Sequence, residues 1–205
     1  MQMNSIYKLH SDRTAAVDFL RSADASALTQ VLGVVGFALL TAAGSQVRLY
    51  LWEVPYTLQT LAVYGSGLYL GWRNGLFAQI LYLCLGLFMP VYAGEGYGPA
   101  YLFGAVTAGY LLGFPLAAMV SGLLSKRWNG LTGSTLALLA GSISLFTLGV
   151  VWFHYAAGHA TWFESIDKGW LRFAVVDLAK ILCVAFVYTG TRQLSRQKDA
   201  ATDSA

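Results

Sequence analysis

The chain has 205 residues, of which 57% are hydrophobic and only 11% are charged, and its mean hydropathy is +0.56. Soluble domains carry about 25% charged residues, so this composition indicates a membrane protein of one domain. The net charge of +3 is small, and the basic residues stand in short connections instead of one patch, which argues against nucleic-acid binding.

Six apolar runs predict six transmembrane helices, and therefore an all-α membrane bundle. Pro55 precedes the second run and Pro90 follows the third, and both runs are short for a crossing that needs about 20 residues. The fourth run contains Pro115, which is expected to kink it. The predicted runs are 28–46, 57–70, 76–89, 101–124, 131–155 and 171–189.

The distribution of Lys and Arg predicts the orientation of the bundle. With the N-terminus inside, only Arg48, Lys168 and Arg172 fall in outer connections, and the other basic residues outside the apolar runs lie on the cytoplasmic side. This asymmetry follows the positive-inside rule, so we expect both termini to be cytoplasmic. Residues 1–25 form a polar N-terminal tail without the apolar core of a signal peptide, 26–191 the transmembrane domain, and 192–205 a second cytoplasmic tail.

Two opposite charges, Asp177 and Lys180, interrupt the last apolar run. At positions i and i+3 of a helix they share one face. Each charge alone costs about 2.5–3.5 kcal/mol at the centre of a membrane, so a retained pair marks a candidate site. In the predicted topology the pair lies in the outer half of the membrane. It either faces a ligand or forms an internal ion pair that ties this helix to a neighbour.

Three other segments have two interpretations each. The glycine-rich stretch that holds Tyr92 and Gly94 is either a loop that covers a small ligand or a plain outer turn. Small residues around Gly109-Tyr110 allow close approach of a flat ligand or of another helix. Ala38 and Ala42 have the small-xxx-small spacing of a helix that docks against another membrane protein or against its own bundle.

The motifs of common enzyme classes are absent. The sequence has no P-loop, no HExxH zinc motif and no GxSxG nucleophile. Its three histidines are scattered, and Cys84 and Cys183 both stand in apolar runs. We therefore expect no catalytic residue, no metal site and no ATP hydrolysis by this chain.

Five segments, in order and spacing, resemble the BioY biotin transporters, which are substrate-binding (S) components of energy-coupling factor (ECF) transporters. The resemblance covers about 28–188. The five segments are Pro55-Tyr56-Thr57-Leu58-Gln59-Thr60, Leu70-Gly71-Trp72-Arg73-Asn74-Gly75, Tyr82-Leu83-Cys84-Leu85-Gly86 with Pro90-Val91-Tyr92-Ala93-Gly94, Gly109-Tyr110-Leu111-Leu112-Gly113-Phe114-Pro115, and Asp177-Leu178-x-Lys180.

This resemblance implies six transmembrane helices that hold one biotin near the outer surface and need no cofactor. Asp177 and Lys180 become contacts for the ureido ring or the valerate carboxylate. Tyr92, Gly94, Gly109 and Tyr110 are then expected to line or cover the bicyclic ring, with Gln59 and Thr57 as weaker candidates, and Ala38 and Ala42 to dock the coupling subunit.

The resemblance also implies an energy source outside this chain, namely a membrane coupling (T) subunit and two ATP-binding (A) subunits in the cytoplasmic membrane. The alternative is an ion-coupled secondary transporter of a small vitamin-like carboxylate, with Asp177 as the proton relay. Two departures from the family pattern permit an altered ligand preference. Val175-Val176 replace the usual Pro-Gly before the aspartate, and the stretch 104–107 lacks Gly-Pro-Thr.

Overall fold

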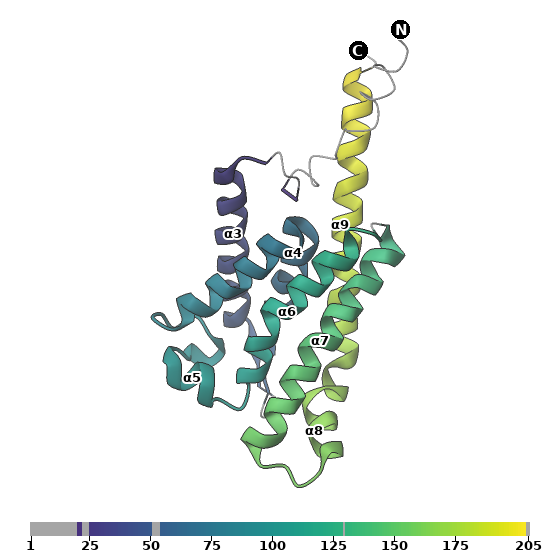
Figure 1. Cartoon of the computed structure of the whole chain (residues 1–205). Coiled ribbons are helices and arrows are strands. Elements are labelled where there is room, and N and C mark those ends of the chain that lie inside the picture. The colour runs from purple at the N-terminus through teal and green to yellow at the C-terminus, as the bar shows by residue number, and fades with distance from the viewer. Residues whose placement is uncertain (1–19, 22–24, 51–53, 129, 204–205) are drawn as a thin grey trace.

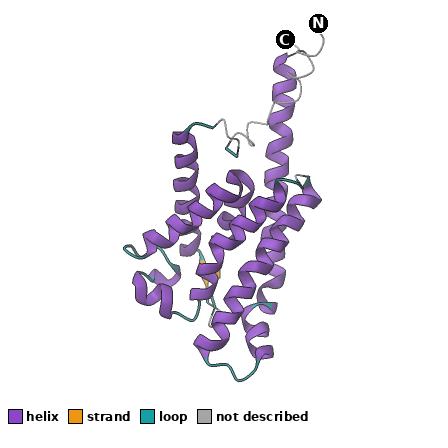
Figure 2. Ribbon diagram, viewed as in Figure 1, coloured by secondary structure: helices purple, strands orange, loops and turns teal. Residues whose placement is uncertain are grey.

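Helices make up nearly all of the structure, a computed structural model that describes residues 20–21, 25–50, 54–128 and 130–203. Figure 1 shows α3, α4, α6, α7 and α9 packed into one bundle, from which α9 extends at one end, while α5 and α8 lie toward the other end. The strands in Figure 2 form a single short pair. The predicted all-α class is confirmed. The predicted tail 1–25 lies largely outside the described residues.

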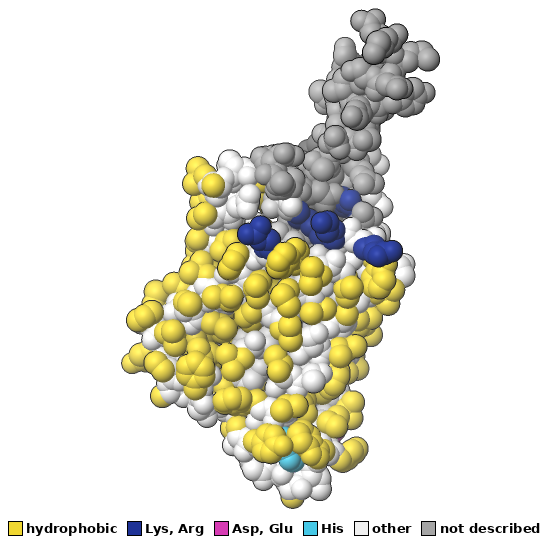
Figure 3. Space-filling model, viewed as in Figure 1, with side chains coloured by type: hydrophobic (Ala, Val, Ile, Leu, Met, Phe, Trp, Pro, Cys, Tyr) yellow, Lys and Arg dark blue, Asp and Glu magenta, His cyan; other side chains and the backbone are white. Residues whose placement is uncertain are grey.

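Three helices in the described part of the chain are long and apolar enough to cross a membrane: α3 (Ala27–Gln46), α6 (Ala108–Ser125) and α7 (Leu131–Ala157). The hydroxyl of Ser26 caps α3 by accepting a hydrogen bond from the backbone N–H of Thr29 at 3.2 Å. Figure 3 shows apolar side chains over most of one face of the bundle. These features agree with a bundle that lies in lipid.

The second and third predicted runs form two helical segments within α4 (Gln59–Gly86), which meet at a kink. The bend is at Gly71, whose φ of 74° and ψ of 179° are essentially restricted to glycine. At this point α4 touches α6 so closely that a side chain at Gly122 would clash with the backbone of Trp72. Each arm is too short to cross the hydrocarbon by itself, which explains the short apolar runs.

The fourth predicted run is not one helix. It divides into α5 (Gly98–Gly104) and α6, and residues 105–107 between them are not helical. The helix α6 continues through Pro115, which lies inside it. A short 3-10 helix, η1 (Ala93–Glu95), connects α4 to α5.

The C-terminal part contains an element that the apolar runs did not predict. The helix α8 (Trp162–Gly169) follows α7, and η2 (Leu171–Phe173) leads into α9 (Ala174–Asp203). Most of the predicted cytoplasmic tail 192–205 is a continuation of α9. The strands β1 (Arg48–Leu49) and β2 (Tyr56–Thr57) pair antiparallel between α3 and α4, with Arg48 opposite Thr57.

Candidate functional site

A partly open cavity of about 70 Å³ lies between β2, the start of α4, α6, α7, η2 and the first turns of α9. One part of its wall is aromatic and the other is polar. The aromatic residues are Tyr101, Tyr110, Phe114, Phe146 and Phe173. The polar residues are Thr57, Gln59, Thr60, Thr107, Asp177 and Lys180.

Asp177 is buried, and hydroxyl groups from two other helices hold its carboxylate. The Tyr64 hydroxyl on α4 donates to both oxygens, with Oη to Oδ1 at 2.9 Å and Oη to Oδ2 at 3.0 Å. The Ser142 hydroxyl on α7 donates to Oδ2 at 2.5 Å. Hydrogen bonds to a charged group are stronger than neutral ones, so these contacts stabilise the ionised carboxylate and fix its direction.

Lys180 binds the end of β2 and the beginning of α4. Its Nζ donates to the Thr57 carbonyl oxygen at 2.7 Å and to the Thr60 hydroxyl at 3.1 Å. An ammonium group has three N–H donors, so one remains for a ligand. Asp177 and Lys180 form no ion pair with each other, although both are among the described residues. They line the same cavity and also tie α9 to α4 and α7 separately.

Three more of the predicted site residues line this cavity. The ring of Tyr110 is in the wall, and its hydroxyl donates to the Gly169 carbonyl oxygen at 2.8 Å. The amide nitrogen of Gln59 donates to the Tyr82 hydroxyl at 2.6 Å, and its amide oxygen accepts from the Thr57 hydroxyl at 3.0 Å. The structure therefore brings Thr57, Gln59 and Tyr110 together with Asp177 and Lys180, although they are up to 123 positions apart in the sequence.

The other three predicted ligand contacts lie outside the cavity wall. Tyr92 is fully buried and its ring stacks on that of Tyr101 at 5.4 Å, so it supports a wall residue. Gly94 lies in η1 with a φ of 76°. Gly109 packs against Trp152 of α7, where a side chain would clash, so its small size serves helix packing.

The predicted docking residues on α3 differ in exposure. Ala38 is fully buried within the chain, which fits the interpretation of packing against its own bundle. Ala42 is half-buried against the core. The outer face of α3 is instead made of large apolar side chains, including Val31, Leu32 and Leu39, at 56%, 62% and 55% exposed.

Sequence reasoning missed Tyr64, Ser142, Thr60 and the aromatic wall residues other than Tyr110. Thr60 and Tyr64 have the i, i+4 spacing of one helical face at the start of α4, which is the signal that could have found both. Phe146 had no such signal. It lines the cavity, and the ring of Trp170, which follows α8, stacks on it with centroids 5.7 Å apart and planes 4° apart.

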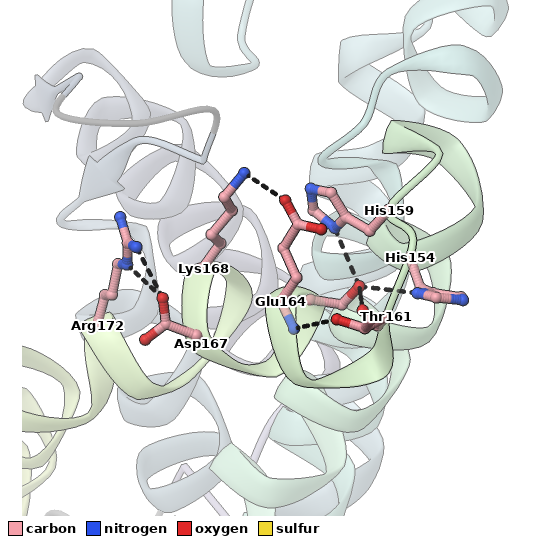
Figure 4. A network of polar contacts seen from close by, with 8 residues as sticks. His154, His159, Thr161, Glu164, Asp167, Lys168 and Arg172 are labelled. Carbon is pink, nitrogen blue, oxygen red and sulfur yellow. Dashed lines mark hydrogen bonds and ion pairs between the residues drawn. The ribbon is translucent and has the colours of Figure 1, made fainter.

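A polar network surrounds α8 and the end of α7 that precedes it (Figure 4). Lys168 donates to Glu164 at 2.9 Å, and this hydrogen bond lowers the pKa of the glutamate carboxyl. Arg172 donates twice to Asp167, at 3.0 and 2.7 Å. Two other members, His154 and His159, place Nδ1 at 2.8 and 3.0 Å from the Ser165 hydroxyl oxygen.

The network fixes two supports of the cavity, the Gly169 carbonyl that binds Tyr110 and the Phe173 ring that lines the wall. The Tyr56 hydroxyl also donates to the Arg172 carbonyl oxygen at 2.7 Å, which joins β2 to η2. No three His, Cys, Asp or Glu side chains of the described residues come together in a way that could hold a metal ion.

The cavity has an aromatic wall, a carboxylate and an ammonium group, and it lies inside an apolar helical bundle. These features are typical of an integral membrane protein with a pocket for a small solute. A model of the BioY family matches residues 14–197. Because this match covers most of the sequence, the chain belongs to the BioY family.

Individual relatives and one solved structure agree with this assignment. The chain is 32% identical over 159 residues to a probable biotin transporter BioY of Lysinibacillus sphaericus, covering 74% of this chain and 80% of the relative. It is 33% identical to a probable biotin transporter BioY of Pyrococcus horikoshii, covering 70% and 84%. Its fold matches the crystal structure of the S-component for biotin from an ECF-type ABC transporter, with a TM-score of 0.74, 18% identity, and 85% and 95% of the two chains covered.

Proposed function

We propose that this chain binds biotin and takes part in its uptake across the cytoplasmic membrane as the S component of an ECF transporter. The observation that carries the proposal is the cavity, because its two kinds of wall correspond to the two kinds of surface on biotin. The ureido group offers N–H donors and a carbonyl acceptor, the valerate ends in a carboxylate, and the fused rings are largely apolar.

The polar wall supplies matching groups. The carboxylate of Asp177 can accept from the ureido N–H donors, because its hydroxyl partners leave lone pairs free. The third N–H of Lys180 can donate to the ureido carbonyl or to the valerate carboxylate. Tyr110, Phe146 and Phe173 would contact the fused rings.

Binding requires the cavity to widen. Its 70 Å³ has room for a few water molecules, whereas sites for small organic ligands occupy about 300–1,000 Å³. The outer segment with η1 and α5 supplies Ala93 and Tyr101 to the wall, and it makes few contacts with the bundle compared with the long helices. We propose that this segment, with Tyr92 and Gly94, moves outward to admit biotin and then closes over it.

The proposal also sets an orientation and partners. Both termini are cytoplasmic, and the cavity opens to the outside. A T subunit docks on α3, on the exposed side next to the half-buried Ala42, and two A subunits supply ATP hydrolysis.

Two experiments test this function. Calorimetric titration of the purified wild-type chain should show saturable binding of biotin and weaker binding of biotinamide, which lacks the carboxylate. In cells that lack other biotin uptake, uptake should require the ATPase partner and persist in the presence of an uncoupler. Failure to bind biotin, or loss of uptake on uncoupling alone, would refute the proposal, and the latter result would favour ion coupling.

A further inference from the structure

Three basic side chains at the bend of α4 and the end of α6 have no partner among the described residues. The side chains of Arg73, Lys126 and Arg127 are exposed, and none of these side chains makes a hydrogen bond or ion pair in the part of the chain that the structure describes. The basic residues at the outer end differ. Arg48, Lys168 and Arg172 each pair with an acidic side chain, at 3.8, 2.9 and 2.7 Å.

These three cations belong to one corner of the molecule. The backbone of Gly71 and Trp72 touches Gly122, and Lys126 lies four residues beyond Gly122, which places it one turn further on the same face of α6. Figure 3 shows Lys and Arg side chains gathered at this level, beside the end from which α9 extends.

A fourth cation strengthens the positive potential of the corner. The guanidinium of Arg21 donates to the Ser125 hydroxyl at 3.0 Å and to the Gly122 carbonyl oxygen at 3.4 Å. The acidic side chains that the structure describes lie elsewhere. Glu95, Glu164 and Asp167 belong to η1 and α8, toward the other end, and Asp177 faces the cavity.

Two tryptophans place the corner at the edge of the hydrocarbon. Trp72 precedes Arg73 and is 39% exposed, and Trp128 follows Arg127 and is 45% exposed. Tryptophan is enriched where a membrane meets water, because the ring is apolar and its N–H needs a polar partner. A phosphate at this depth lies within reach of the adjoining guanidinium and ammonium groups.

We propose that this corner, formed by Trp72, Arg73 and residues 126–128, binds the phosphate headgroups of anionic phospholipids in the cytoplasmic leaflet. A guanidinium binds two phosphate oxygens at once, and an ammonium adds a point charge. The acidic face of a partner protein is the rival occupant. The lipid is favoured because both tryptophans flank the cations at the level of the interface and apolar side chains continue below them.

Native mass spectrometry of the full chain, in detergent with equimolar phosphatidylglycerol and phosphatidylcholine, tests the proposal. The wild type should retain more phosphatidylglycerol. The variant R73Q/K126Q/R127Q should lose this preference. The loss should be about fivefold for each cation removed, because each cation contributes the electrostatic attraction of one positive charge to an anionic surface. The matched control R48Q removes a cation at the outer end and should keep the preference.

Equal retention of the two lipids by the wild type would overturn the proposal, as would a preference that survives in the triple variant. An acidic protein that binds the wild type but not the triple variant, without any lipid preference, would assign the corner to a protein partner and also overturn it. If the triple variant loses its helical circular dichroism, a salt series on the wild type decides: the preference must fall as ionic strength rises. None of these readouts involves biotin, so they are independent of the proposed function.

Discussion

The hydroxyl groups of Tyr64 and Ser142 should control how well the site binds biotin. Both donate to the Asp177 carboxylate, and Tyr64→Phe and Ser142→Ala each remove one donor with little change of shape. A hydrogen bond to a charged group contributes about 1.5–3 kcal/mol. If the carboxylate must keep its direction to accept from the ligand, each variant should weaken binding by about 10- to 150-fold.

Calorimetric titration of purified protein measures this effect, with Tyr69→Phe as the matched control. Tyr69 is also on α4, but its hydroxyl pairs with Thr191 away from the cavity. The double variant should lose less affinity than the sum of the single losses, because both hydroxyls orient one carboxylate. Biotin affinities of both single variants equal to that of the control would refute the positioning role.

Three further predictions concern the fold around the site. Gly71→Ala should lower the free energy of unfolding by about 1–3 kcal/mol, because alanine is strained in the backbone conformation that the bend of α4 needs. The control Gly36→Ala, in open space on α3, should not lower it, and thermal melts in detergent compare the two variants. Gly109→Val should lower the melting temperature by forcing α6 away from Trp152, but the ligand affinity of the folded fraction should stay near that of the wild type. Weaker binding together with an unchanged melting temperature would contradict this prediction. The hydrogen bond from Lys168 lowers the pKa of Glu164, so the pair stabilises α8 fully above the unfolded-state pKa of about 4.3. This stabilisation is lost as the pH falls through the lower pKa of the folded state. The difference in melting temperature between the wild type and Glu164→Gln should therefore shrink over that pH range.

The helical class and the polar pair of the last helix could be predicted from sequence because both depend on local signals. Apolar runs indicate segments that lie in the membrane, and a charged residue within such a run is easily recognised in the sequence. Thr57 and Gln59 were predicted through the resemblance of their segment to the BioY motif, and not from the apolar pattern.

The remaining features depend on contacts that a linear pattern does not contain. Ser142 is one of several serines in α7, and only the packing of α7 against α9 shows that it holds Asp177. The single apolar run at 101–124 hides the break before α6, because residues 105–107 are themselves mostly apolar. The helix α8 was missed because it is short and amphipathic, so no apolar run marks it.

The central claim is that Asp177 and Lys180 bind biotin from one cavity. Its most direct test is the equilibrium affinity of purified Asp177→Asn and Lys180→Ala for biotin, beside the wild type and with the helical circular dichroism of each checked. Each substitution removes a charge that the ligand would otherwise meet, so we predict at least about a tenfold loss of affinity in both, from 1.5 kcal/mol or more for a charged hydrogen bond. Wild-type affinity in both folded variants would contradict the account.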